Sequence, residues 1–299
     1  MRHQPGSRRS SSSRPSTSHF PTSHRDECGP PPVTLRVGWF TSGRGEGSRA
    51  MYRATSDAIR NGALNAEIAV LFCNRDPGES SATDELIEEA RADRVPVVTR
   101  SSVAFRRARG GERSRPGEPL PTWRTEYDRA VDADLAAHPF ELGVLAGYML
   151  IFGAEFVAKH SLLNFHPALP TGPAGTWREV IRDLIRGRAE ESGVMMHLAL
   201  AEVDEGPVAS FCRYPLRDET LAPRWDELEP RIDAAGDEEL EQSALFAAIR
   251  ERGLAQETPL LVATLRAFAK DWLKVEDGRL LGGAPLELPA TSLPAPAAT

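Results

Sequence analysis

Short apolar segments alternate with helical segments along the first half of the chain, and this alternation constrains the fold more than any other feature. Strands are expected at 33–40, 67–73 and 95–99, because these runs are apolar and contain many β-branched residues. Amphipathic helices are expected between them, at 49–60 and 82–92. Strand–helix–strand alternation is typical of a parallel sheet covered by helices. The sequence therefore predicts a doubly wound α/β fold with a mostly parallel sheet.

The alternation continues beyond an irregular stretch. Residues 101–122 are rich in Gly, Pro and Arg, which predicts a mobile surface insertion. We interpret the acidic residues of 226–241 as a solvated face and 276–299 as a flexible C-terminal tail. The remaining expected elements are helices at 125–137, 153–159, 176–185, 244–252 and 259–273, and strands at 142–146, 162–165, 192–200 and 207–214.

Length and composition limit the classes of function. A chain of 299 residues can bury one large α/β core or two small ones, and a single catalytic domain is expected at 33–275. The three cysteines (Cys28, Cys73 and Cys212) have no disulfide or zinc-site spacing, which favours a reducing, cytoplasmic setting and predicts no metal. No stretch reaches the roughly 18 to 20 apolar residues that span a bilayer. The net charge of -7 disfavours nucleic-acid binding.

Residues 1–32 differ in composition from the rest of the chain. They are rich in Ser, Arg and Pro and contain little to bury, so they are predicted to be a disordered tail. A nucleic-acid-binding arm is the alternative interpretation of their arginines, and low complexity favours the solvated tail. No apolar segment follows these arginines, so no secretion signal is expected.

A glycine-rich turn with the sequence TSGRGEGS, at 41–48, follows the first expected strand and leads into a helix. Glycines let a backbone approach an anion closely, and the free N–H groups of a first helical turn point towards it. The turn is therefore a candidate anion site. Its spacing matches neither GxGxxG nor a P-loop, and many α/β proteins have such a turn without a ligand.

The segment Asn164-Phe165-His166-Pro167 lies at the end of an expected strand, where ligands bind in open α/β sheets. Asn164 and His166 are two residues apart, so on a strand both side chains face the same way. The amide can donate to an oxygen that gains negative charge, and the imidazole can do the same or move a proton. Asp204, in the turn between the last two expected strands, can orient the imidazole or accept a proton from an amine. These groups suit acyl transfer to an amine.

A purely structural role is the alternative for these residues. A histidine after a strand is often a hydrogen-bonded core residue, and Asp204 in Asp-Glu-Gly-Pro could begin a turn.

Taken together and in order over residues 33–214, the motifs resemble those of the folate-dependent formyltransferase family. The similarity rests on Asn164 to Pro167 followed by Leu169-Pro170, His197 with Asp204 to Pro207, Leu145 to Met149, and Gly47-Ser48-Arg49. The resemblance implies that family's fold and the transfer of a formyl group from 10-formyltetrahydrofolate to a primary amine.

The resemblance also implies roles by position. Asn164 and His166 would stabilise the tetrahedral intermediate, and Asp204 would hold His166 and relay a proton through water. The pterin pocket would be formed by Leu145, Gly147, Met149, Leu150, Ile151, Phe152, Leu200 and Ala201. The phosphate-bearing acceptor would be bound by Gly47, Ser48, Arg49, Met149 and Pro167.

Within the family, the motifs are most similar to those of members that formylate glycinamide ribonucleotide in purine biosynthesis. The resemblance therefore implies a small phosphorylated amine as the substrate. The protein is expected to be a monomer or a homodimer. The chain departs from the family pattern at Leu150, in the short loop after His166, and at Glu257, which matches an acceptor-binding acid only loosely. Another amine acceptor, from secondary metabolism or sugar-nucleotide synthesis, or a non-catalytic folate or nucleotide binder, remain alternatives.

Overall fold

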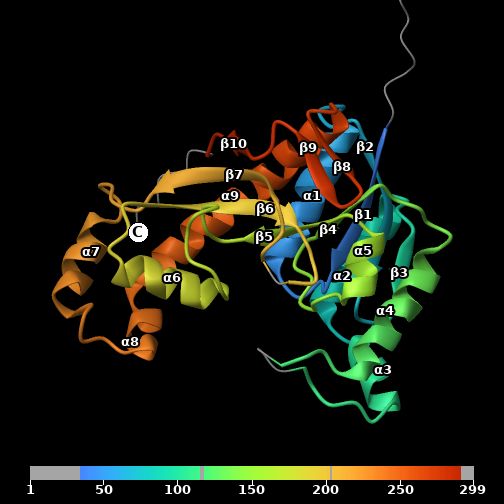
Figure 1. Ribbon diagram of the computed structural model, residues 1–299, viewed down its shortest axis with the longest axis horizontal. Helices are drawn as coiled ribbons and strands as arrows, with labels where there is room; N and C mark the ends of the chain where they lie inside the picture. The colour runs from blue at the N-terminus through green and yellow to red at the C-terminus, as the bar shows by residue number, and fades with distance from the viewer. Residues whose placement is uncertain (1–33, 115–117, 203, 291–299) are drawn as a thin grey trace, which may run out of the picture. The chain divides into compact units, whose positions relative to one another are not determined.

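An eight-stranded sheet is the centre of the part of the chain that the computed structural model describes, residues 34–114, 118–202 and 204–290 (Figure 1). The strand order is β10-β7-β6-β5-β4-β1-β2-β3. All neighbouring pairs are parallel except those of β6 with β5 and β7. The strands are β1 (Leu35–Thr41), β2 (Ala66–Cys73), β3 (Val97–Thr99), β4 (Leu142–Leu145), β5 (Leu162–His166), β6 (Glu191–Leu198), β7 (Val208–Pro215) and β10 (Leu286–Leu288).

Helices cover both faces of the sheet, because consecutive strand residues are apolar and point to opposite sides. Trp39 of β1 belongs to one core cluster and its neighbour Phe40 to the other. The first cluster is covered by α1 (Glu46–Arg60), α2 (Ser81–Ala92), α6 (Trp177–Arg186) and α9 (Ala244–Ala269), and the second by α3 (Ser102–Ala108), α4 (Thr122–Leu135) and α5 (Ala154–Lys159). The prediction of a doubly wound, mostly parallel sheet with C-terminal helices is confirmed.

The segment expected to be an irregular insertion contains helix α3. Ser101 caps this helix by accepting a hydrogen bond from the Ala104 backbone N–H at 3.1 Å. Phe105 is buried, and its ring centroid lies 5.2 Å from that of Tyr127 on α4. The expectation of irregular structure is therefore wrong for 102–108. A buried aromatic side chain and an N-cap stabilise this helix, although the Gly, Pro and Arg residues around it in the sequence do not indicate one.

Helix α9 is a single element of 26 residues with Pro259 inside it, whereas the sequence indicated two helices separated before this proline. Proline removes one helical hydrogen bond and tends to end a helix. Leu260, Leu261 and Thr264 directly after it are fully or almost fully buried against the sheet. Tertiary packing therefore outweighs the local preference, and the prediction of a break is wrong.

The predicted flexible tail from residue 276 onwards also contains ordered elements. A hairpin of β8 (Leu273–Glu276) and β9 (Arg279–Gly282) is followed by β10, which pairs in parallel with β7 and places Leu286 opposite Ser210. The prediction is wrong for the segments that form β8, β9 and β10, the last of which ends at Leu288, because the exposed edge of β7 offers unpaired backbone groups to a short apolar segment. Residues 1–32 and 291–299, also predicted to be tails, lie outside the described residues.

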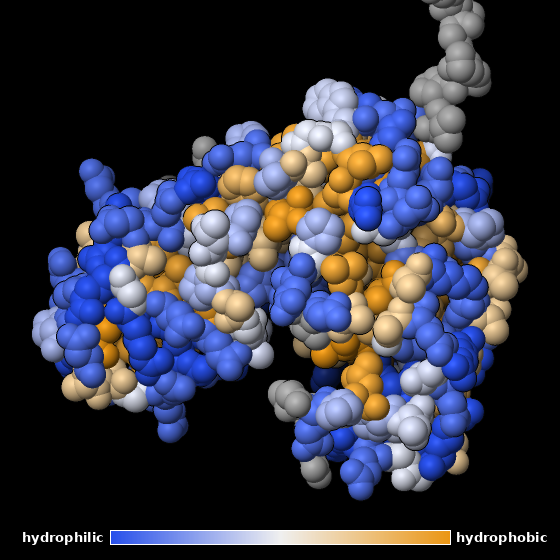
Figure 2. Space-filling view, in the orientation of Figure 1, coloured by the Kyte–Doolittle hydropathy of each residue, from blue (hydrophilic) through white to orange (hydrophobic). Residues whose placement is uncertain are grey.

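The acidic region 226–241 falls on α7 (Ala222–Leu228), a 3-10 helix η1 (Glu229–Arg231) and α8 (Asp237–Gln242). Its carboxylates pair with arginines of α6 and of the turn after α6. Figure 2 shows that the surface over α6, α7 and α8 is largely hydrophilic. The pairs include Glu241 with Arg178 at 2.5 Å, Asp237 with Arg186 at 2.5 Å and Glu229 with Arg188 at 2.6 Å. The interpretation as a merely solvated face is therefore incomplete.

None of the helices in the described residues is long and apolar enough to cross a membrane.

Candidate active site

The chain changes direction in the sheet between β1 and β4, since β2 and β3 lie on one side of β1 and β4 and β5 on the other. At such a switch point the loops after the two strands separate and leave a crevice for a ligand. Here the two loops are also joined by hydrogen bonds. The Ser42 N–H donates to the Gly147 carbonyl at 3.1 Å, and the Met149 N–H donates to the Ser42 hydroxyl at 3.0 Å.

The backbone conformation and the crowding at Gly147 favour glycine over residues with a side chain. Its φ is +71°, a region that side chains disfavour, and a Cβ added there would lie 3.0 Å from the Cβ of Ser48. The close approach brings the segment after β4 against the first turn of α1. The predicted pterin segment and the predicted phosphate turn therefore lie side by side at the carboxyl ends of β1 and β4.

The three predicted catalytic side chains come together at the end of β5. The Asn164 Nδ2 donates to Asp204 Oδ1 at 3.4 Å, and Asp204 Oδ2 lies 3.5 Å from His166 Nδ1. Strand β6 runs antiparallel to β5 with His197 opposite Asn164, so the turn after β6 returns Asp204 to the motif. That turn is tight, because Asp204 has a φ of +60° and a Cβ on Gly206 would lie 1.7 Å from the Leu198 carbonyl oxygen.

Both ring nitrogens of His166 face oxygen acceptors. Nδ1 faces the carboxylate of Asp204, and Nε2 donates to the Pro173 carbonyl at 2.9 Å. The His166 side chain is 4% exposed. Burial lowers the pKa of His166, but Asp204 and the Pro173 carbonyl outweigh it and raise that pKa above its ordinary value. The contacts therefore favour a positively charged imidazole.

A second histidine shares the same carboxylate. His197 Nε2 lies 3.4 Å from Asp204 Oδ1, and its Nδ1 donates to the Leu198 carbonyl at 3.0 Å. Burial by itself raises the pKa of Asp204, but the two imidazoles hold that pKa well below its usual range. Sequence reasoning included His197 in the resemblance without giving it a role, and its place opposite Asn164 in the sheet was the missing signal.

A cavity of about 190 Å³ lies beside the three side chains. Asn164, His197 and Asp204 reach it, whereas His166 does not line it. Met149 and Ile151 stand at its rim and are 69% and 46% exposed. Of the eight residues predicted to form the pterin pocket, six line the cavity (Leu145, Met149, Leu150, Ile151, Phe152 and Leu200) and Gly147 and Ala201 do not.

The turn after β1 differs from the expectation in one respect. Helix α1 begins at Glu46 with Gly45 as N-cap and no side-chain cap, so Gly47 and Ser48 lie in its first turn. The Ser48 hydroxyl donates to the Gly45 carbonyl at 3.0 Å. The guanidinium of Arg49 pairs with Glu89 on α2 at 2.6 Å and also with Glu85.

The Arg49 side chain is thus directed to α2 and its charge is matched there. Arg44, between two glycines of the same turn, is exposed and has no ion-pair partner within the described ranges. Pro167, the remaining predicted substrate residue, is half-buried directly after His166.

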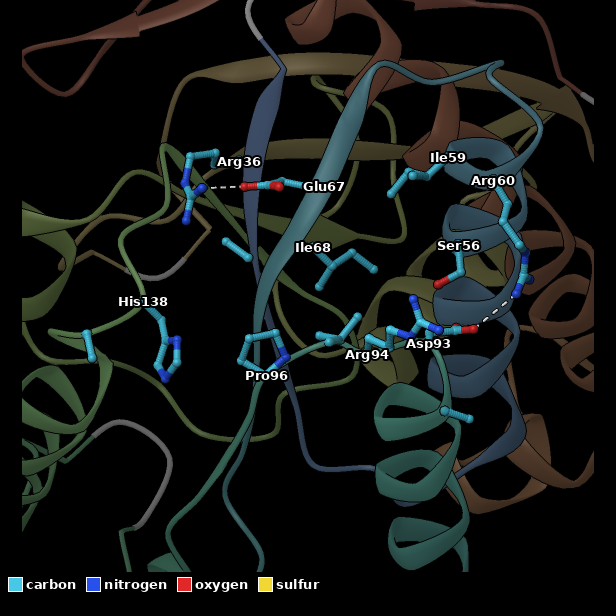
Figure 3. A pocket seen from close by; sticks show the side chains of 14 residues that line it. Arg36, Ser56, Ile59, Arg60, Glu67, Ile68, Asp93, Arg94, Pro96 and His138 are labelled. Carbon is cyan, nitrogen blue, oxygen red and sulfur yellow. Dashed lines mark hydrogen bonds and ion pairs between the residues drawn. The ribbon is translucent and has the colours of Figure 1, made fainter.

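A larger cavity of about 730 Å³ lies at the opposite, amino ends of the strands (Figure 3). Figure 3 shows Arg36 of β1 paired with Glu67 of β2, and Arg60 of α1 paired with Asp93 at the end of α2. Its charged groups thus largely satisfy one another, and it is remote from Asn164 and Asp204. We therefore place the candidate active site at the smaller cavity.

Comparison with known proteins identifies the class to which this fold and site belong. The family model described as formyl transferase matches residues 36–219. The chain belongs to this family. A phosphoribosylglycinamide formyltransferase of Mycobacterium tuberculosis (strain H37Rv) is 34% identical over 115 residues, which are 36% of this chain and 53% of that protein. The matched region thus spans about half the length of that relative.

Two solved structures illustrate the fold. A phosphoribosylglycinamide formyltransferase of Coxiella burnetii superposes with a TM-score of 0.57 and 20% identity, covering 86% of this chain and all (100%) of that one. A formyltetrahydrofolate deformylase of Pseudomonas syringae superposes with a TM-score of 0.53 and 17% identity, covering 84% of this chain and 66% of that one. At these identities the likeness shows the fold alone.

Proposed function

We propose that this protein transfers a formyl group from 10-formyltetrahydrofolate to a primary amine, and that the amine belongs to glycinamide ribonucleotide. The observation that carries the proposal is the convergence of Asn164, His166 and Asp204 at one side of an apolar cavity, in a chain of the formyl transferase family.

The reaction begins when the amine nitrogen attacks the formyl carbon and the carbonyl oxygen gains negative charge. The Asn164 amide, which reaches the cavity, donates to that oxygen. Asp204 and the Pro173 carbonyl raise the pKa of His166 and so favour its protonated form, which would stabilise the same oxygen electrostatically from behind Asn164 and Asp204. A direct hydrogen bond from His166 requires Nε2 to leave the Pro173 carbonyl.

Asp204 takes part in the proton transfer. Its carboxylate stays ionised, because its pKa lies far below neutrality, so it stabilises the positive charge that forms on the attacking amine. The proton passes through water from the amine to N10 of the folate. The bond between the formyl carbon and N10 then breaks, and the formylated amine and tetrahydrofolate are released.

The two ligands would occupy neighbouring parts of the site. The folate ring would lie against the apolar side chains of the 190 Å³ cavity, which include six of the predicted pocket residues. The acceptor phosphate would lie at the first turn of α1, where Gly45 leaves the N–H groups without a side-chain cap. Arg44 supplies the adjacent positive charge in place of Arg49.

A different amine acceptor is the second candidate. Glu257, the loose match to an acceptor-binding acid, lies inside α9 and 3.5 Å from Arg250. Burial raises the pKa of Glu257, and Arg250 opposes that shift. A carboxylate that already has an arginine partner is less available to an acceptor, which favours an amine other than that of glycinamide ribonucleotide.

Steady-state assays with both kinds of acceptor test the proposal. The protein with 10-formyltetrahydrofolate is expected to form tetrahydrofolate rapidly only when glycinamide ribonucleotide is present. Replacement of His166 by Ala is expected to reduce kcat about 10²-fold or more. Turnover with other amines but none with glycinamide ribonucleotide would support the second candidate. Activity of His166→Ala within a few-fold of wild type would overturn the mechanism.

A further inference from the structure

Helix α4 packs beside the segment 147–153, which connects β4 to α5. Residues of this segment line the 190 Å³ cavity in which the formyl donor is proposed to bind. Two α4 side chains bind the backbone of this segment. The Gly153 N–H donates to Asp128 Oδ2 at 2.7 Å, and Arg124 Nη2 donates to the Ile151 carbonyl. Arg124 is 1% exposed and Asp128 is 4% exposed. Both contacts are therefore shielded from water.

The two side chains form a buried ion pair whose geometry is not optimal. Arg124 Nη2 lies 3.9 Å from Asp128 Oδ1, and neither Arg124 Nε nor Asp128 Oδ1 has a hydrogen-bond partner in the described part of the chain. Removing two charges from water is costly, and a pair of apolar side chains often stabilises a core equally well. The pair is thus better explained by what it positions than by core stability.

The apolar side of the segment is held separately. The ring of Tyr148 stacks on Phe152 with centroids 4.7 Å apart, and Phe152 stacks on Phe156 of α5 at 4.0 Å. These rings anchor side chains, but they do not fix the backbone between them. The backbone orientation at Ile151 and Gly153, and with it the direction of the exposed Ile151 side chain, depends on Arg124 and Asp128.

We infer that Arg124 and Asp128 are positioning residues for the formyl donor, and that their ion pair holds the 147–153 segment in the form that receives the folate ring. This inference rests on the proposed function. Affinity for the donor is then expected to fall when Asp128 loses its charge, because Arg124 loses its counter-charge and both backbone contacts loosen.

The charge of Asp128 changes within an accessible pH range. Burial raises the pKa of Asp128 to about 6, while the Gly153 N–H and Arg124 oppose that shift. Glu155 of α5 also faces Asp128 and raises its pKa, although Glu155 is paired with Arg129 at 2.8 Å. The carboxylate is thus charged at pH 8 and largely neutral at pH 5.

Calorimetric binding of tetrahydrofolate at pH 5 and pH 8 tests the inference, with wild type, Asp128→Asn and Arg124→Met. Wild type is expected to bind about tenfold more weakly at pH 5, since a hydrogen bond to a charged group is worth roughly this factor. Asp128→Asn is expected to bind about tenfold more weakly at pH 8 and to lose this pH dependence. The matched control is Asp132→Asn, because Asp132 pairs instead with Lys159 at the end of α5 (2.6 Å) and with His160 directly after it (2.8 Å).

Two further measurements separate positioning from general stability. Amide hydrogen exchange is expected to accelerate in 147–153 in Asp128→Asn but not in Asp132→Asn. In steady-state kinetics, KM for the donor is expected to rise while KM for the acceptor is unchanged.

Wild-type affinity and exchange in folded Asp128→Asn would overturn the inference, and Asp128→Asn keeps this test open if Arg124→Met fails to fold. If wild type binds no tetrahydrofolate, the proposed function fails. Faster exchange in 147–153 of Asp128→Asn would then still support the structural part of the inference, and unchanged exchange would refute it as well.

Discussion

Replacing Asp204 by Asn removes the negative charge that His166, His197 and Asn164 all contact, and it leaves the shape of the side chain almost unchanged. Asp204 lies 3.5 Å from His166 and 3.4 Å from His197, and it accepts a hydrogen bond from Asn164 at 3.4 Å. In Asp204→Asn, the carbonyl oxygen of the new side-chain amide can still accept from Asn164. The substitution therefore tests the negative charge rather than the packing.

The magnitude follows from these distances. At an effective dielectric constant of about 20, two unit charges about 3.5 Å apart attract each other by roughly 5 kcal/mol, before the desolvation of both groups reduces that figure. A net loss of about 3 to 5 kcal/mol corresponds to a fall in kcat of about 10² to 10⁴-fold. Because burial then acts on His166 without the carboxylate, the pKa of His166 is expected to fall.

Initial-rate kinetics and NMR titration of the imidazoles measure the two effects. Glu205→Gln is the matched control, since Glu205 is the adjacent carboxylate and is exposed. A rate within about fivefold of wild type, together with an unchanged His166 titration, would show that Asp204 neither charges His166 nor assists the proton transfer.

The remaining predictions concern stability and the turns around the site. Phe105→Ala is expected to lower the free energy of unfolding by about 3 to 5 kcal/mol in denaturant titrations, because it removes the anchor of α3, whereas the exposed-side control Arg107→Ala is expected to change it little. Gly206→Ala is expected to abolish most activity, since its Cβ would lie 1.7 Å from the Leu198 carbonyl oxygen; an active, equally stable variant would contradict the tight turn. Deleting 283–299 is expected to lower Tm and increase self-association in light scattering, because the edge of β7 loses β10. The free energy of unfolding is expected to decline as pH falls below about 4, the ordinary pKa of an Asp in the unfolded chain. Folding lowers the pKa of Asp204, so the ionised carboxylate stabilises the folded state above that pH and this stabilisation is lost as the carboxylate is protonated. Asp204→Asn is expected to show a shallower decline in acid denaturation.

The sequence predicted the elements whose signals are local. Apart from α3, the strands and helices from β1 to β7 follow apolar periodicity, and their observed limits differ from the expected ones by only a few residues. The elements that it missed depend on distant partners. Phe105 of α3 packs on Tyr127, α9 continues through Pro259 with buried residues on both sides of the proline, and β10 pairs with the edge of β7.

In the candidate site, too, some features were predicted from the sequence and others depend on distant partners. Residue types and spacing made Asn164, His166 and Asp204 candidates with a structural alternative, and the resemblance to the formyltransferase family selected them. The partner of His166 Nε2 could not be predicted, since a backbone carbonyl such as that of Pro173 is set by the path of the loop and not by residue type. The pairing of Arg49 with Glu85 and Glu89 was equally inaccessible, because it depends on how α2 packs beside α1.

Formyl transfer itself is tested most directly with a donor labelled with ¹³C at the formyl carbon, incubated with the protein and glycinamide ribonucleotide and followed by mass spectrometry. The proposed function predicts that the label appears in the formylated amine, at a rate that falls about 10²-fold or more in Asn164→Ala. Label recovered only as formate would show that water is the acceptor, and label remaining in the donor would show that the site does not act on it. Either result would contradict transfer to this amine.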